Sequence, residues 1–146
     1  MSSSIENADQ VAELWSKTYN TQGRPDWSHI LPYYADDICF RDSIQEIRGI
    51  DEFTRMTERL ANRSQELHMN VVRARMQDNI AFIEWEMTIS YKKNPRSVLY
   101  GASRLTLDEE GRIREQRDYY DLWGDIFNNI PRFGKMYRKF MKKKFG

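Results

Sequence analysis

Residues 80–91, IAFIEWEMTISY, decide the fold class of this chain because their side chains alternate with a period of two. The odd positions form an apolar series: Ala81, Ile83, Trp85, Met87, Ile89 and Tyr91. The even positions become polar after the first two residues: Glu84, Glu86, Thr88 and Ser90. Such alternation is typical of a strand that packs one face on a core. The sequence therefore predicts a long β-strand here.

Two more strands are expected directly after this one. Asn94-Pro95 predicts a turn into a strand over residues 98–107, and residues 108–111, DEEG, predict a turn into a strand over residues 112–122. Consecutive strands joined by short turns pair antiparallel. We therefore expect an antiparallel sheet to occupy most of the chain from residue 64 onward.

Helical patterns precede the sheet. Ser3 and Glu6 have the spacing of a capping box, ahead of an apolar stripe that predicts a first helix ending near residues 20–23. Pro25 opens a short second helix, and Asp51 is a good cap for a third. The predicted class is α+β, a cone in which the curved antiparallel sheet wraps around the N-terminal helices.

Composition limits the kind of protein. The 146 residues are 40% hydrophobic and 31% charged, as expected for one globular domain. Cys39 is the sole cysteine, so no internal disulfide can form, which suits a reducing compartment. The N-terminus lacks the pattern of a secretion signal, and no apolar run approaches the roughly 20 residues that cross a bilayer. We expect a cytoplasmic protein.

Charge divides the chain into two parts. Residues 132–146 hold seven basic residues and no acid, whereas the other residues hold 16 bases against 22 acids, a net charge of −6. We therefore divide the chain into a domain over residues 1–125 and an amphipathic basic helix over residues 126–146. This helix is expected to pack on its own domain or on the partner in a homodimer. Docking on a membrane surface is the less favoured alternative, and the acidic body argues against a nucleic-acid partner.

The concave side of such a cone is a usual place for a small-molecule pocket. If the even positions of residues 80–91 face inward, the pocket is lined by Trp15, Tyr19, Phe40, Asp42, Phe53, Glu84, Glu86, Ser103, Gln116, Asp118 and Tyr120. If the odd positions face inward instead, Trp85 and Met87 line it and both glutamates lie outside. Burial and crowding raise the pKa of a carboxyl, so one such group could hold a proton near neutral pH.

Three stretches carry a resemblance to a known family. They are residues 34–42, YADDICFRD, residues 49–53, GIDEF, and residues 111–121, which run from GRI to RDYYD. Together with the order of elements, they resemble the NTF2-like superfamily over residues 5–125, and within it the SnoaL-like group. The resemblance implies a cystatin-like cone and a pocket, in a superfamily that includes ketosteroid isomerases, limonene epoxide hydrolases, polyketide cyclases and non-enzymes.

The enzyme patterns match only in part. Asp42 matches the general base of the isomerases, while the positions of their oxyanion donors hold Trp15 and Ser103. Asp118 matches the first aspartate of the epoxide hydrolases' RDYFD-like segment. The Asp and bridging Arg of those hydrolases correspond to Glu84 and Glu86, so the Arg is lost. A single acid/base Asp, as in SnoaL-type cyclases, could be Asp42 or Asp118.

The resulting hypothesis is a homodimeric protein that binds a small hydrophobic or cyclic molecule. If it is an enzyme, it would run cofactor-free isomerisation, cyclisation or hydration, with Asp42 as base and Asp118 as proton donor or second base. The alternatives are a non-catalytic binding module and a protein that docks through its C-terminal helix. His29 and His68 lack a spaced partner, so no metal site is predicted.

Overall fold

The computed structural model describes residues 3–19, 25–91 and 95–146. In this part of the chain six strands form one sheet in the order β2-β1-β6-β5-β4-β3. The strands are β1 (Tyr34–Arg41), β2 (Glu46–Arg48), β3 (Ser64–Gln77), β4 (Ile80–Tyr91), β5 (Ser97–Leu107) and β6 (Ile113–Tyr120). The helices are α1 (Ala8–Tyr19), α2 (Ile50–Arg63), α3 (Leu122–Asp125) and α4 (Phe133–Phe145), with short 3-10 helices η1 (Leu31–Tyr33) and η2 (Phe127–Asn129).

The long strands confirm the period-two pattern. β4 pairs antiparallel with β3 on one side and β5 on the other, and its odd residues from Ala81 to Ile89 are buried. The sheet is not wholly antiparallel, however, because β1 and β6 run parallel. A parallel pair needs a long crossover, and here everything from β2 to β5 lies between the two strands in sequence.

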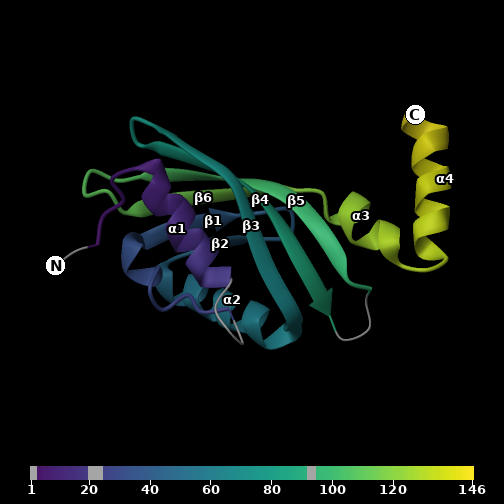
Figure 1. Ribbon diagram of the computed structural model, residues 1–146, viewed down its shortest axis with the longest axis horizontal. Coiled ribbons are helices and arrows are strands. Elements are labelled where there is room, and N and C mark those ends of the chain that lie inside the picture. Colours follow the sequence, from purple (N-terminus) through teal and green to yellow (C-terminus); the bar gives the residue numbers. More distant parts are fainter. Residues whose placement is uncertain (1–2, 20–24, 92–94) are drawn as a thin grey trace.

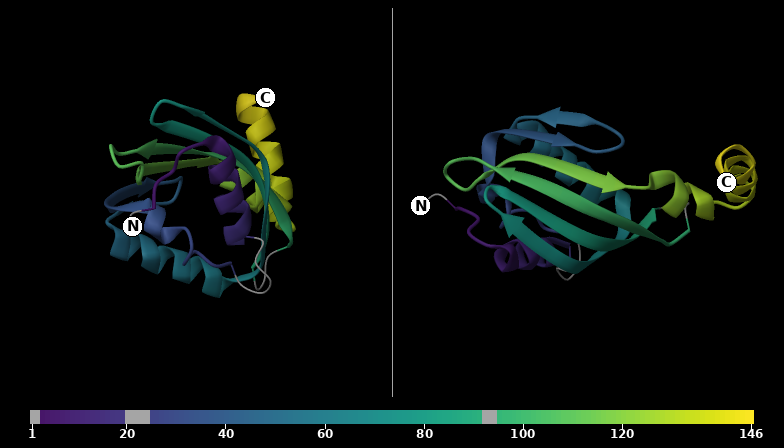
Figure 2. Two further views of the ribbon diagram at one scale, coloured as in Figure 1. Left: turned by 60° about the vertical axis from the view of Figure 1, so that its left-hand side comes forward. Right: turned by 90° about the horizontal axis from the view of Figure 1, so that it is seen from above.

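The sheet curves around the helices to give the α+β cone expected from the sequence. Figure 1 shows α1 and α2 on the same side of the sheet, and the end-on view in Figure 2 shows the sheet bending around them. α1 packs on β3 and β4, while α2 packs on β1 and β2. Both helices therefore cover the concave face, which places the hydrophobic core between them and the sheet.

The N-terminal segment differs from its prediction. The capping box of Ser3 and Glu6 does not form, because the backbone N–H of Ile5 donates to the carbonyl of Gly111 at 2.8 Å and holds this segment beside the β5–β6 turn. The helix begins at Ala8 instead, and the Asn7 side chain accepts from the N–H of Gln10 at 2.8 Å. The short helix expected after Pro25 is reduced to a turn and η1, since Tyr34 already belongs to β1.

The C-terminal residues form a small unit at one end of the domain. α3 and η2 follow β6, and α4 packs on η2. Figures 1 and 2 show α4 at the opposite end of the molecule from the N-terminus. Among the described residues, no helix is long and apolar enough to span a membrane.

Candidate functional site

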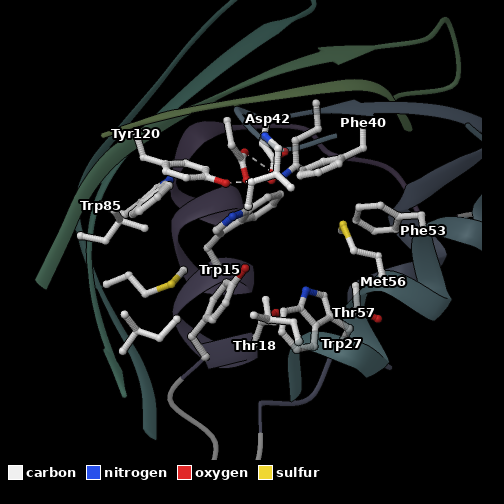
Figure 3. A pocket seen from close by; sticks show the side chains of 18 of the residues that line it. Trp15, Thr18, Trp27, Phe40, Asp42, Phe53, Met56, Thr57, Trp85 and Tyr120 are labelled. Carbon is white, nitrogen blue, oxygen red and sulfur yellow. Dashed lines mark hydrogen bonds between the residues drawn. The ribbon is translucent and has the colours of Figure 1, made fainter. Parts of the chain in front are cut away.

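A cavity of about 310 Å³ lies between α1, α2 and the concave face of the sheet. Most of its wall is aromatic and aliphatic, with Trp15, Trp27, Phe40, Phe53 and Trp85 among the lining residues (Figure 3). One cluster of polar side chains comes from β6 and the end of β1, through Gln116, Asp118, Tyr120 and Asp42, and α1 and α2 add Thr18, Tyr19, Thr57 and Arg63. The cavity is therefore an apolar chamber with a polar patch on one wall, the usual composition of a small-molecule site.

Asp118 is the partly buried carboxyl at the centre of this polar patch. Its Oδ1 accepts a hydrogen bond from the Ser103 hydroxyl at 2.6 Å and another from Gln116 Nε2 at 3.0 Å. Within the described residues no donor reaches Oδ2, so one oxygen is held by the protein and the other is available to a ligand. Burial raises the pKa of Asp118 from 3.8 to about 6, although its two hydrogen bonds act in the opposite direction.

Gln116 has its amide orientation fixed by Tyr34. The Tyr34 hydroxyl donates to Gln116 Oε1 at 2.6 Å, which turns the NH₂ group toward Asp118. On the other side, Trp85 Nε1 donates to Ser103 Oγ at 3.0 Å, and this hydroxyl then donates to Asp118. Two donor chains thus converge on one carboxylate oxygen, and both favour its ionised form.

Removing the Tyr34 hydroxyl tests this arrangement. In Tyr34→Phe the Gln116 amide loses its fixed orientation and donates less well to Asp118, so the pKa of Asp118 should rise further above 6. The free energy of unfolding should fall by about 1 kcal/mol for the lost hydrogen bond. Carboxyl-carbon NMR titration would measure the pKa. Tyr33→Phe is the matched control, and an equal shift in that variant would contradict the proposed network.

Asp42 lies at the end of β1 and also lines the cavity, but its oxygens already have partners. Oδ1 accepts from the backbone N–H groups of Ile44 and Gln45 at 2.8 and 2.9 Å, and Oδ2 accepts from the Tyr120 hydroxyl at 2.9 Å (Figure 3). Burial raises the pKa of Tyr120, which keeps this phenol protonated as a donor. Asp42 therefore shapes the turn that brings Ile44 and Gln45 to the cavity.

Tyr19 supplies a second polar group to the chamber. Burial raises the pKa of its hydroxyl, and the nearby charge of Asp118 raises it further. The phenol is therefore neutral at every pH at which the protein would be studied. It can donate a hydrogen bond to an oxygen that gains negative charge.

Most of the residues predicted for the pocket do line it. These are Trp15, Tyr19, Phe40, Asp42, Phe53, Gln116, Asp118 and Tyr120. Ser103 is buried behind Asp118 and does not line the cavity, so its hydroxyl acts on the carboxylate instead of on a ligand. The predicted lining residues therefore lie around the cavity, except those on β4 and β5.

The prediction that Glu84 and Glu86 point into the pocket is wrong. Odd residues of β4 pair with odd residues of β5, with Ile83 opposite Ser103. Directly paired residues lie on the same face of a sheet, so the odd residues of β4 face inward together with Ser103. Trp85, Met87 and Ile89 line the cavity, as the alternative register required. Glu84 lies on the outer face, where its carboxylate pairs with Arg73 at 2.8 Å.

Tyr34 was not among the residues predicted for the site, yet it begins β1 and lines the cavity together with Phe40 and Asp42. An irregularity in the pairing of β1 with β6 lies between Tyr34 and Cys39, so a simple period of two along β1 does not indicate its position. Leu122 and Ile126, which close another part of the cavity, had no comparable signal because they follow the last strand.

No group of three or more potential metal ligands comes together within the described residues.

Comparison with known proteins agrees with this architecture. The family model described as "SnoaL-like domain" matches residues 7–116, which is most of the chain and includes α1, α2 and Gln116. The chain belongs to the SnoaL-like domain family. The match ends two residues before Asp118, so it assigns no role to this carboxyl. A search of curated proteins finds no match.

Solved structures resemble this SnoaL-like protein over most of its length. A hypothetical protein with a ketosteroid isomerase-like fold from Catenulispora acidiphila, in complex with trimethylamine, has a TM-score of 0.71 and 16% identity, covering 84% of this chain and 92% of the other. An LEH-like epoxide hydrolase from M. tuberculosis has a TM-score of 0.66 and 17% identity, covering 90% and 97%.

A third structure belongs to a protein assigned as a SnoaL-like polyketide cyclase, from Shewanella denitrificans. Its TM-score is 0.60 at 17% identity, covering 75% of this chain and 88% of the other. The resemblance to the NTF2-like superfamily and its SnoaL-like group is thus confirmed. At such low identity the similarity establishes the fold of this SnoaL-like protein, and its reaction must be argued from its own side chains.

Proposed function

We propose that this SnoaL-like protein binds a small, largely apolar cyclic molecule in the cavity and that Asp118 catalyses a cofactor-independent proton transfer on it. One observation carries the proposal: within the described residues, a partly buried carboxyl with a pKa of about 6 has one oxygen fixed by the protein and the other without a donor. A group whose pKa lies near the working pH is well suited to both accept and return a proton.

The proposed step uses only groups of this chain. At neutral pH the Asp118 carboxylate takes a proton from a carbon next to a carbonyl. The electron pair of that C–H bond forms a C=C bond, and the π pair of the carbonyl moves to its oxygen. The neutral Tyr19 phenol supports that oxygen with a hydrogen bond. Asp118 then returns the proton to another carbon of the conjugated enolate. Alternatively, the enolate carbon attacks a second carbonyl of the same molecule, the π bond of that carbonyl breaks, and the resulting alkoxide takes the proton from Asp118. Isomerisation or cyclisation results without a consumed cofactor.

Hydration of an epoxide is the second candidate, favoured by the position of Asp118 beside Gln116. The carboxylate would take a proton from water while the oxygen of the water bonds to carbon and the ring C–O bond breaks. Asp118 would then pass this proton to the ring oxygen, whose developing charge the neutral Tyr19 phenol supports with a hydrogen bond. The Gln116 amide is held by Tyr34 and Asp118, so it could orient but not activate this water.

Two isotope experiments test the proposal and separate the candidates. The purified protein is incubated in D₂O with a panel of cyclic ketones and polyketide-like diketones, and separately in H₂¹⁸O with cyclic epoxides. Enzyme-dependent deuterium incorporation would support enolisation, and ¹⁸O in a diol would support hydration. The rate should rise with pH through the pKa of Asp118, which is about 6 in the free protein. A bound ligand can shift this pKa. Binding of these compounds without either isotope exchange would indicate a non-catalytic binding module.

Asp42 has a positioning role in this proposal. Asp42→Asn keeps an oxygen that can cap the turn, so it should change turnover less than tenfold. Asp42→Ala removes the cap and the contact to Tyr120, and should lower the free energy of unfolding by about 1–3 kcal/mol. Activity and thermal unfolding of both variants provide the measurement. If Asp42→Asn abolishes turnover while the protein stays folded, Asp42 is the base, as the sequence first suggested.

A further inference from the structure

The C-terminal helix α4 carries opposite chemistry on its two sides. Apolar side chains gather on one side, and basic side chains occupy most of the other, as the 3.6-residue period places them. The apolar residues are Phe133, Met136, Tyr137, Phe140, Met141 and Phe145. Residues 132–146 hold seven bases without an acid. α4 is therefore a strongly basic amphipathic helix.

The apolar side of α4 is covered only near its start. Trp123 of α3 packs with Phe133 and with Tyr137 at ring-centroid distances of 6.2 Å, and Phe127 of η2 packs with Phe133 at 5.9 Å. Further along, Met136, Phe140 and Phe145 are exposed, and Phe140 keeps 55% of its surface accessible. Trp123 itself is 54% exposed, so it extends this apolar surface beyond the helix.

α4 has a fixed orientation despite this exposure. The N–H of Gly134 donates to the Ile130 carbonyl at 2.7 Å, and Arg138 Nη1 donates to the carbonyl and side-chain oxygens of Asn128 at 3.0 and 2.9 Å. A Cβ at Gly134 would lie 1.9 Å from the Asn128 carbonyl oxygen, so only glycine allows this approach. The exposed face is thus held outward by the fold.

We propose that this surface, formed by α4 and Trp123, docks on a membrane that contains anionic lipids. An amphipathic helix with basic residues on one side and large apolar residues on the other lies in the plane of a bilayer surface, with its apolar side inserted at the headgroup boundary. The sequence led us to favour packing on the domain or on a dimer partner. Within the described residues the domain itself leaves the outer part of this face open.

The lysine-rich composition of α4 favours anionic lipid over a protein partner or a nucleic acid. Five of the seven bases are lysines, namely Lys135, Lys139, Lys142, Lys143 and Lys144. Lysine is depleted in protein–protein interfaces, whereas clusters of basic residues on an amphipathic helix are attracted to anionic headgroups. A nucleic acid would satisfy the lysines but would leave Phe140 and Phe145 in water.

The docking surface adjoins the cavity through α3. Leu122 of α3 and Ile126, the residue after α3, line the cavity. Trp123 of the same helix is exposed and packs against α4. A membrane bound by α4 would therefore lie one short helix away from the apolar chamber. The docking goes beyond the proposed function and does not depend on it.

Vesicle binding by the full chain tests the proposal. We expect co-sedimentation with vesicles of phosphatidylcholine and phosphatidylserine, little binding to phosphatidylcholine alone, and weakening by salt. Trp15, Trp27 and Trp85 are buried, so a blue shift of tryptophan emission on binding should come from Trp123. Brominated lipid should quench this emission. Trp123→Phe should remove the shift and retain most of the binding.

Two variants and their controls locate the surface. Phe140→Ser and the triple variant Lys139→Glu, Lys142→Glu, Lys143→Glu should each weaken binding at least tenfold. Phe82→Ser removes a similarly exposed phenylalanine, at 50%, from the outer face of the sheet and should bind normally. Arginine at the same three lysine positions should also bind normally. Circular dichroism would confirm that each variant is folded.

Two outcomes would overturn the proposal. The first is vesicle binding that persists unchanged in both α4 variants, since another part of the molecule would then be responsible. The second is the absence of vesicle binding by the wild type. If Phe140→Ser also lowers the mass measured by light scattering in that case, α4 instead contacts a second copy of the chain, as in the homodimer that the sequence suggested.

Discussion

Asp118→Asn is expected to abolish turnover and, at neutral pH, to make the protein more stable. An amide cannot accept the proton from the substrate, and loss of a general base typically costs 10²–10⁴-fold in rate. The amide oxygen can still accept hydrogen bonds from Ser103 and Gln116, so the cavity should keep its shape and its affinity for the ligand. The rate and the affinity should therefore respond differently to this one change.

The gain in stability follows from the raised pKa of Asp118. The carboxyl titrates near 3.8 when unfolded and at about 6 in the folded protein, which corresponds to about 3 kcal/mol at most. Below pH 3.8 Asp118 is protonated in both the folded and the unfolded state, so it does not lower the free energy of unfolding. Between these two pH values the unfolded state has released a proton that the native state still binds, so wild-type stability falls as pH rises and stays lower above 6.

Thermal unfolding of both proteins across pH 4 to 8 measures this effect. Asp118→Asn should unfold at a higher temperature than the wild type at pH 8, and the difference should shrink toward pH 4. Stability gained together with activity lost is the mark of a group kept for function at a cost to the fold. A variant that is less stable at pH 8 would show that Asp118 serves as a structural carboxylate and would contradict the proposed role.

Gly101→Ala is expected to destabilise the domain by about 1–3 kcal/mol, the usual cost of overfilling a packed site. Gly101 of β5 pairs with Trp85 of β4, and the Trp85 indole lies across it. A Cβ at position 101 would come within 2.4–2.8 Å of three atoms of the six-membered ring. The indole would have to move into the cavity, and its hydrogen bond to Ser103 would break.

Chemical denaturation and ligand affinity together measure the Gly101 effect. Ala102→Val adds volume on the other face of the same strand and should have a smaller effect. Replacing Trp85 with Phe in the Gly101→Ala background should recover part of the stability, because the smaller ring leaves room for the new methyl group. Equal destabilisation by the alanine in both backgrounds would indicate that the indole is not the source of the strain.

Most of the site could be predicted from sequence because short-range rules place its residues. Period two puts Gln116, Asp118 and Tyr120 on one face of β6, and it puts Phe40 and Asp42 on one face of β1. The error in β4 arose where the same rule was not followed. Its first even residues, Ile80 and Phe82, are apolar, but the even positions that follow are polar, so the composition of the strand favoured the odd face and the two glutamates were placed against it.

The sequence by itself determined the fold class, the family and the residues that gather on the strand faces, because these depend on the local period of side chains. Tertiary structure decided the inward face of β4, since a one-residue change in pairing with β5 exchanges Glu84 for Trp85. It also decided how the two aspartates differ. Asp42 meets two backbone N–H groups of a turn, whereas Asp118 lies among apolar side chains with one oxygen open. Burial and hydrogen bonding act through neighbours distant in the chain, and these neighbours set the chemistry of a carboxyl.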